Sequence, residues 1–285
     1  MRFTTLMQLI KNKTQLLDFI KDTYKGRIGL VPTMGALHQG HISLIKKSKE
    51  ENDVTIGSIF VNPIQFNNQT DLIAYPRPEA EDLDLLRKAG CDAVFMPSIE
   101  EMYPQKPLIK FNFGALEEVM EGAFRPGHFN GVAIVVSKLF NLIKPTNAYF
   151  GLKDYQQVAI ITQLVKDLSY PINIIPCDTI RESDGLAMSS RNRRLSPEKL
   201  ILASKIYQSL QMASSLLFSE EIEKAKQEVV DYYKGLPDFT LEYFEISDAE
   251  TLQPVKNVKE HKKIVLCIAA YLDGVRLIDN ILLIV

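Results

Sequence analysis

Two histidines, His38 and His41, lie three residues apart in the segment 32–41, which reads PTMGALHQGH. A short apolar stretch, 27–32, leads into this segment, and a helical pattern of apolar residues follows it. A turn between a strand and a helix presents backbone N–H groups at the helix N-terminus, where phosphate binds. Imidazole N–H groups can donate to phosphate oxygens there, and Gly40 has no side chain to keep a nucleotide away from the backbone. The pattern therefore indicates a site that stabilises charge developing on a phosphate.

Two standard phosphate motifs do not fit this segment. The dinucleotide fingerprint G-x-G-x-x-G is absent. Gly35 and Gly40 have the spacing of a P-loop, but His41 and Ile42 stand where that motif needs Lys and Ser or Thr. Two other interpretations stay open: both histidines could have purely structural roles, or they could bind a metal together with His128.

A second cluster of candidate residues lies in the loop 184–194, which reads DGLAMSSRNRR. The adjacent hydroxyls of Ser189 and Ser190 and the guanidinium of Arg191 are donors suited to the β- and γ-phosphates of a nucleotide. The alternative is a solvated basic loop that leads into a helix. Taken together with the histidine segment, the cluster favours a polyphosphate held from two sides.

The elements that must position these residues alternate between strand and helix up to Asp178. Buried apolar runs predict strands at 27–32, 53–61, 93–96, 148–150 and 172–175. Apolar residues at helical spacing predict helices from Ile42 onward and at 78–89, 131–143 and 155–168. Repeated strand–helix units are typical of an α/β fold, here a Rossmann-like doubly wound parallel sheet.

The pattern changes after Asp178, where a charged loop precedes a helix with Ser196 as N-cap and Pro197 at its first position. A second amphipathic helix is predicted to open at Ser219. Three strands are then predicted, at 240–246, 263–270 and 275–277. We therefore expect two domains: residues 1–178 and a smaller C-terminal α+β domain, residues 179–285.

Composition narrows the class of partner. Among 285 residues, 33 Lys and Arg stand against 35 Asp and Glu, a formal net charge of −2 that gives no overall field for nucleic acid. Cys91, Cys177 and Cys267 form no C-x-x-C pair, which is typical of a reducing compartment. Residues 1–26 contain no apolar run that suits a signal peptide or a membrane span. We expect a cytoplasmic protein with small-molecule partners, no nucleic acid and no membrane.

Six segments resemble, in order, segments of the pantothenate synthetase family. The segment 32–41 is similar to the HxGH segment of HIGH-type nucleotidyltransferases, the superfamily to which that family belongs, and 188–191 is similar to their KMSKS-type loop. The six segments are 32–41, 60–66 (FVNPIQF), 75–77 (YPR), 125–132 (RPGHFNGV), 151–157 (GLKDYQQ) and 184–192 (DGLAMSSRN).

The resemblance implies an ATP-dependent ligase of pantothenate and coenzyme A biosynthesis. Such an enzyme condenses pantoate with β-alanine through a pantoyl-adenylate intermediate and releases AMP and pyrophosphate. It also implies a homodimer. We expect residues 1–178 to bind pantoate and ATP. The domain 179–285 is expected to act as a lid, because a free adenylate would be hydrolysed in water. The runner-up is a nucleotidyltransferase that leaves the nucleotide in its product, and a nucleotide-binding sensor without turnover is a third possibility. An aminoacyl-tRNA synthetase is disfavoured because no strongly basic face is evident.

The resemblance also assigns roles to individual residues. His41 is the expected proton donor to the departing pyrophosphate, and Gln65 and Gln157 are expected to bind pantoate, with Asn62 and Arg125 as further lining residues. The catalytic candidates that act on the phosphates are His38, His41, Lys153, Ser189, Ser190 and Arg191. The expected ATP-binding residues are Met34, Gly35, Ala36, Leu37, His38, Gln39, Gly40, His41, Gly151, Leu152, Lys153, Asp154, Ile180, Met188, Ser189, Ser190 and Arg191. The family commonly has an acidic residue where Leu152 stands.

Mg²⁺ is expected to accompany ATP. It would bridge phosphate oxygens and keep several waters, so no dedicated cage of protein ligands is expected. Glu81 and Asp82 are possible carboxylate contacts for it. The alternative is that both belong to an exposed first turn of a helix.

Overall fold

The computed structural model describes residues 6–23, 26–217 and 221–285. The chain divides into two compact units. The first consists of Met1–Asn112, Arg125–Leu152 and Ile160–Asp178, and the second of Phe113–Phe124, Lys153–Ala159 and Thr179–Val285. The longest segment of the second unit begins at Thr179, next to the junction expected at Asp178. The observed division is not a single cut there, because two earlier segments also belong to the second unit.

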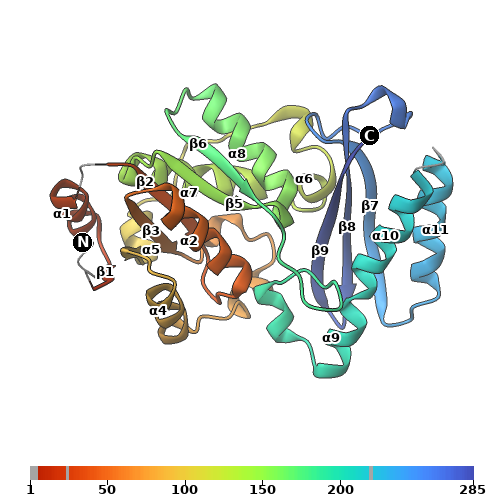
Figure 1. The fold of residues 1–285 in the computed structure, drawn as a ribbon, viewed down its shortest axis with the longest axis horizontal. Helices are drawn as coiled ribbons and strands as arrows, with labels where there is room; N and C mark the ends of the chain where they lie inside the picture. Colours follow the sequence, from red (N-terminus) through yellow and green to blue (C-terminus); the bar gives the residue numbers. More distant parts are fainter. Residues whose placement is uncertain (1–5, 24–25, 218–220) are drawn as a thin grey trace. The chain divides into compact units, whose positions relative to one another are not determined.

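In the described part of the first unit, six parallel strands form one sheet in the order β1-β4-β3-β2-β5-β6, with helices around it (Figure 1). This confirms the doubly wound α/β fold. The strands are β1 (Gln8–Ile10), β2 (Ile28–Thr33), β3 (Val54–Ile59), β4 (Ala93–Phe95), β5 (Asn147–Gly151) and β6 (Asn173–Cys177). The α-helices are α1 (Lys13–Thr23), α2 (Gln39–Glu51), α3 (Gln69–Ile73), α4 (Glu79–Lys88), α5 (Ile99–Met102), α7 (His128–Ile143) and α8 (Tyr155–Asp167), the last of which begins in the second unit.

The strand order places two loops at one point of this sheet. From β2 the chain proceeds to β3 and β4 on one side, whereas from β5 it proceeds to β6 on the other. Strands β2 and β5 are hydrogen-bonded neighbours, so the direction of winding reverses between them. In an open α/β sheet, ligands bind outside the carboxyl ends of the strands at such a reversal. The segments that leave β2 and β5 there begin at Met34 and Leu152.

The second unit is built on three antiparallel strands in the order β7-β8-β9, among the residues that the structure describes. These strands are β7 (Phe239–Asp248), β8 (Lys263–Leu272) and β9 (Val275–Ile284), and the helices are α6 (Met120–Phe124), α9 (Pro197–Ala203), α10 (Lys205–Leu217) and α11 (Ile222–Lys234). Apolar residues of α10 and α11, including Leu210 and Val229, share a core with Ile264 and Ile268 of β8. This confirms the smaller α+β fold, and Ser196 caps α9 as expected. The start expected for a helix at Ser219 lies outside the described residues.

Candidate active site

The loop after β2 has an unusual backbone shape that a buried carboxylate holds. Gly35 and Ala36 both have positive φ angles, 81° and 49°. The carboxylate of Asp82 on α4 accepts the N–H of Ala36 at 2.8 Å and that of Leu37 at 2.7 Å. A Cβ atom on Gly35 would lie 3.0 Å from one of the same carboxylate oxygens, which leaves little room for a side chain. Asp82 therefore fixes the path of the loop that carries the histidines.

The burial of Asp82 differs from what the sequence-based alternative expected. Only 1% of it is exposed, so the alternative of an exposed helical turn is wrong for Asp82, although its neighbour Glu81 is exposed. Both Asp82 oxygens accept backbone N–H groups of the loop. No local pattern indicates this contact, because Asp82 and Ala36 are 46 residues apart.

His38 and His41 cap the first turn of α2. The Nδ1 atom of His38 accepts the N–H of Gly40 at 3.2 Å, and Nδ1 of His41 accepts the N–H of His38 at 3.3 Å. A ring nitrogen that accepts a hydrogen bond carries no proton, so in each neutral imidazole the proton is on Nε2. The rings lie close, with centroids 4.1 Å apart. Each histidine thus has a structural nitrogen and a donor nitrogen, so the structural and the phosphate-binding interpretations are compatible.

Gln65 lies beside the same loop, at the end of the 3₁₀ turn η1 (Pro63–Gln65). Its Nε2 donates to the sulfur of Met34 at 3.3 Å, and its Oε1 accepts from Nδ2 of Asn62 at 2.9 Å. The hydroxyl of Tyr103 donates to Oδ1 of Asn62 at 2.8 Å, and burial raises the pKa of Tyr103, which keeps it a donor. Nδ1 of His128 bonds the backbone carbonyl of Gln65 at 2.8 Å. The structure therefore brings an expected pantoate residue next to an expected ATP residue.

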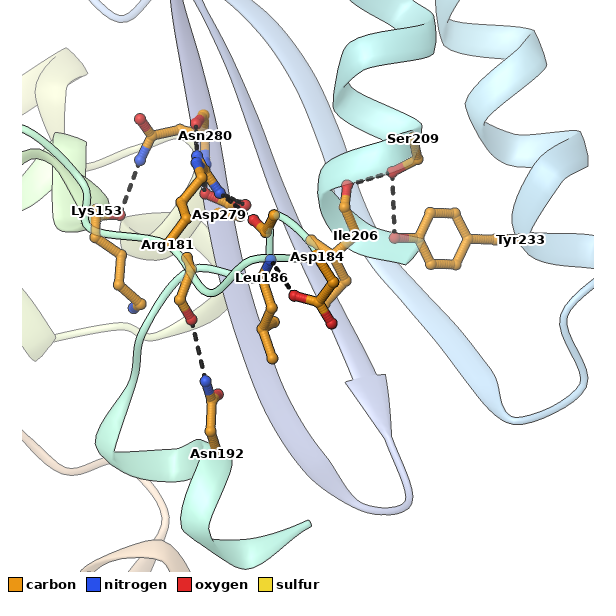
Figure 2. A network of polar contacts seen from close by, with 12 residues as sticks. Lys153, Arg181, Asp184, Leu186, Asn192, Ile206, Ser209, Tyr233, Asp279 and Asn280 are labelled. Atoms are coloured by element: carbon orange, nitrogen blue, oxygen red, sulfur yellow. Dashed lines mark hydrogen bonds and ion pairs between the residues drawn. The ribbon is translucent and has the colours of Figure 1, made fainter. Parts of the chain in front are cut away.

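In the second unit, Lys153 lies in the 3₁₀ turn η3 (Leu152–Asp154), directly after β5. Its Nζ is 3.9 Å from Oδ1 of Asp154, and its side chain is largely buried. Its backbone carbonyl accepts a hydrogen bond of 2.8 Å from Nδ2 of Asn280 on β9 (Figure 2). Strand β9 therefore holds the backbone of this candidate residue.

Residues 180–188 form a small hairpin. The N–H of Met188 donates to the carbonyl of Ile180 at 3.0 Å, and Arg181 pairs with Ala187 in an antiparallel bridge. Directly after it, Ser189 caps the 3₁₀ helix η4 (Ser190–Arg194) by accepting the N–H of Arg191. The expected nucleotide residues Ile180 and Met188 are thus brought together, and the Ser189–Arg191 stretch follows from a defined structure.

Gln157 is half-buried in the first turn of α8, in the second unit, whereas Gln65 lies in the first. Its neighbour Gln156 is buried and donates Nε2 to the carbonyls of Leu116 and Val119, at 2.8 and 2.9 Å. Gln156 therefore has a structural role. The binding of pantoate by Gln65 and Gln157 together stays a prediction.

The other candidate residues divide between the two units in the same way. The first unit holds Met34 to His41, Gly151 and Leu152, and the second holds Lys153, Asp154, Ile180 and Met188 to Arg191. Their action on one shared triphosphate stays a prediction as well. In the part of the chain that the structure describes, no helix has the length and apolar character needed to cross a membrane.

The chain is similar to known proteins of one family over nearly its whole length. Residues 6–282 match the family model of pantoate-beta-alanine ligase. The pantothenate synthetase of Cytophaga hutchinsonii is 51% identical over 259 residues, covering 90% of this chain and 92% of that relative. That of Bacteroides fragilis is 48% identical over 276 residues, covering 97% and 98%.

Solved structures give the same result. Pantothenate synthetase from Thermus thermophilus aligns with a TM-score of 0.91 and 38% identity, covering 96% of this chain and 99% of that chain. A pantoate-beta-alanine ligase from Francisella tularensis, complexed with beta-gamma ATP and β-alanine, aligns with a TM-score of 0.82 and 40% identity, covering 97% of each chain.

Proposed function

The chain belongs to the pantoate-beta-alanine ligase family, and on this premise we propose that it condenses pantoate with β-alanine to form pantothenate, using ATP. The observation that carries the proposal is the histidine pair that caps α2, in the segment that leaves β2 where the winding of the sheet reverses. Both Nδ1 atoms accept backbone N–H groups, so both rings have Nε2–H as their donor. Neutral donors at a helix N-terminus suit phosphate oxygens whose charge grows during a reaction.

In the first half-reaction, a carboxylate oxygen of pantoate attacks the α-phosphorus of ATP. The bond from that phosphorus to the bridging oxygen breaks, and pyrophosphate leaves with the electron pair. Phosphoryl transfer gains mainly from positioning and charge stabilisation. His38, His41, Lys153 and Arg191 act on the growing charge, with Nε2–H of His41 donating a hydrogen bond to the departing pyrophosphate and Ser189 and Ser190 as further neutral donors.

Gln65 suits the nucleophile because its amide is neutral. An arginine would hold the pantoate carboxylate more strongly but would also weaken it as a nucleophile. The amide of Gln65 is oriented by Met34 and Asn62, and an amide can donate to a carboxylate or accept from a hydroxyl. We assign Gln157 the same role, from the second unit.

Mg²⁺ enters with ATP in this proposal. The buried carboxylate of Asp82 already accepts two backbone N–H groups of the loop. We therefore expect that Mg²⁺ would be held chiefly by phosphate oxygens and water rather than by Asp82. When bound, the ion neutralises part of the phosphate charge. The residues of the chain orient the nucleotide around it.

In the second half-reaction, the amine of β-alanine attacks the carbonyl of pantoyl adenylate. The amide bond forms, the amine loses a proton and AMP leaves. Water would hydrolyse the adenylate, so we propose that the second unit, which contains the loop 181–194, closes over it as a lid. The loop should become less sensitive to protease when ATP and pantoate are added, and equal sensitivity would contradict closure.

We further propose a cytoplasmic homodimer. Support comes from an exposed apolar pair, Leu108 and Ile109, in a stretch without helix or strand, where Leu108 is 93% exposed. Apolar side chains exposed side by side are typical of interaction surfaces. Light scattering after size-exclusion chromatography measures the mass, and a monomer would contradict the dimer.

The activity is tested by incubating the protein with ATP, Mg²⁺ and pantoate, with and without β-alanine. Pantothenate, AMP and pyrophosphate should form in equal amounts only when β-alanine is present. ADP as the product, or a nucleotide retained in the product, would contradict the proposal.

A further inference from the structure

Strand β9 (VRLIDNILLI) has two adjacent polar residues, Asp279 and Asn280, in a sequence whose other residues are apolar except Arg276. Asp279 is 4% exposed and Asn280 is 7% exposed. Strand β9 is at the edge of its sheet, in the order β7-β8-β9, so among the described residues one side of its backbone pairs with no strand of that sheet. Buried polar groups lower stability unless they have partners. The partners of this pair are the two segments expected to bind nucleotide in the second unit.

Asp279 and the backbone of Asn280 hold the hairpin 180–188 through Arg181. The guanidinium donates to both oxygens of Asp279, at 2.6 and 2.9 Å, and to the carbonyl of Asn280 at 3.1 Å. It also donates to the carbonyl of Gly185 at 3.0 Å and lies 3.9 Å from the ring centre of Tyr207. A planar, multiply bonded guanidinium has little freedom to move. The hairpin that leads into Ser189 is therefore fixed on β9.

The side chain of Asn280 holds the other segment. Its Nδ2 donates to the carbonyl of Lys153 at 2.8 Å (Figure 2). Two consecutive residues of one strand therefore anchor both the turn that carries Lys153 and the hairpin that leads to Ser189–Arg191. A shift of β9 at this point would move both together.

We propose that Asp279 and Asn280 are positioning residues, which set Lys153 and the Ser189–Arg191 stretch at the distance needed to act on the same phosphates. The inference rests on the proposed function for its chemistry, since neither residue is assigned a contact with substrate. It concerns the adenylation step, because pyrophosphate has left before β-alanine reacts. A loss of position should therefore slow the first half-reaction and spare the second.

The test uses Asn280→Ala and Arg181→Lys in the full chain. Removing Asp279 itself would leave a buried guanidinium without its carboxylate and would endanger folding. Ser209→Ala is the matched control, since Ser209 is fully buried in α10 of the same unit and bonds Ile206 and Tyr233, neither of which belongs to the two anchored segments. Adenylation is followed as pantoate-dependent pyrophosphate release in a single turnover. The second step is followed by adding β-alanine to preformed pantoyl adenylate.

Asn280→Ala should slow pyrophosphate release by about tenfold or more, since small displacements of a catalytic group have large effects on rate. It should leave the reaction of preformed adenylate near the wild-type rate, and Ser209→Ala should change neither rate. An equal loss in both steps would identify a merely structural role, and no loss in either would show that β9 does not set the position. Both outcomes overturn the proposal.

Hydrogen exchange gives a readout that needs no activity. Amides of residues 152–155 should exchange faster in Asn280→Ala, and those of 181–188 faster in Arg181→Lys, with neither changed in Ser209→Ala. Unchanged exchange in both variants would overturn the anchoring by β9. A wild-type protein that forms no pantothenate would instead overturn the proposed function, while the exchange data would still decide whether β9 holds the two segments.

Discussion

Each imidazole of the histidine pair uses its two nitrogens differently. Nδ1 of His38 and of His41 accepts a backbone N–H of the first turn of α2, and Nε2 holds the proton. Histidine is suited to this arrangement because its ring has an acceptor and a donor on separate atoms. A single residue type can therefore fix the helix start and present a donor to a phosphate.

Substitutions at His41 can separate the two functions. In His41→Asn the side-chain oxygen can replace Nδ1 as acceptor for the N–H of His38, but no group replaces Nε2–H. We expect a melting temperature near that of the wild type and a loss of about 10²–10³ in the rate of pyrophosphate release.

His41→Ala removes both functions and serves as the comparison. It should lose similar activity and, in addition, about 0.5–2 kcal/mol of stability from the missing cap. Rates come from single-turnover assays, and stability comes from urea unfolding. A His41→Asn protein that retains most of its rate would show that Nε2–H has no part in the chemistry.

The types and spacing of residues were enough to single out His38 and His41, and the hydroxyls before Arg191, as candidates. They were not enough to predict Asp82 or Arg181. The partners of these two residues are distant in sequence, 46 residues for Asp82 with Ala36 and 98 for Arg181 with Asp279. Only the fold brings such pairs together. Local pattern thus indicates which groups can do chemistry, whereas tertiary contacts decide which residues hold them.

At the scale of elements, the loop after β2 depends on a contact made from α4. Its two successive positive φ angles are stabilised by the Asp82 carboxylate, whose two oxygens accept two N–H groups. Asp82→Asn would set an NH₂ group against one of these N–H donors. We expect the free energy of unfolding to fall by about 1–3 kcal/mol.

Asp82→Asn should also raise the KM for ATP and leave the KM for β-alanine unchanged, because it is the nucleotide loop that loses its shape. Asp84→Asn on the same helix is a suitable control, since Asp84 forms an exposed ion pair with Lys88 at 2.7 Å. Such pairs contribute about 0.3–0.5 kcal/mol. Equal effects of the two substitutions on the KM for ATP would contradict the role of Asp82.

The turn after β7 gives the second unit a pH-dependent contribution to stability. Although burial acts to raise it, hydrogen bonds from Thr251, His261 and Glu250 lower the pKa of Asp248 to about 2. A carboxyl whose pKa is lower in the folded state stabilises the fold above its unfolded pKa, which is about 4. That contribution is lost as pH falls through the folded pKa.

Asp248→Asn should therefore lower the free energy of unfolding near neutral pH by about 1 kcal/mol, allowing for solvent screening. The difference from the wild type should vanish between about pH 4 and about pH 2. Urea titrations across this range measure it. A difference that stays constant with pH would show that the charge of Asp248 does not stabilise the turn.

Most strands could be predicted as elements because they are continuous apolar runs. Observed β2 to β6 overlap the expected ranges, with ends that differ by at most two residues. Strand β9 was predicted to end at Leu277 and extends to Ile284. The polar pair Asp279 and Asn280 interrupts its apolar pattern. Burial of that pair is possible because Arg181 donates to Asp279 and Asn280 donates to the carbonyl of Lys153.

At the scale of the whole molecule, the sequence predicted one junction, after Asp178. One boundary between the observed units falls at that position, but segments 113–124 and 153–159 also belong to the second unit. Part of the reason is visible in Arg276 of β9, which donates to Glu121 at 2.7 Å and forms a buried ion pair with it. Pattern along a chain yields contiguous domains, whereas side-chain contacts between distant residues do not follow sequence order. Lys153 belongs to the same unit as Met188–Arg191, and its carbonyl accepts a hydrogen bond from Asn280 of β9, although β5 ends just before it.

The two units must both act on ATP if the proposed reaction is correct, and their coupling can be measured without a structure of the complex. His38 belongs to the first unit and Arg191 to the second. If both stabilise charge on the same triphosphate, the loss of one changes the effect of losing the other. His38→Ala and Arg191→Ala should then be non-additive in the rate of pyrophosphate release, with a coupling of about 0.5–3 kcal/mol.

Lys234→Ala provides the control, since Lys234 forms an exposed ion pair with Asp231 on α11. Combined with His38→Ala it should be additive. Additive effects for His38 and Arg191 as well would mean that the two loops act on separate ligands.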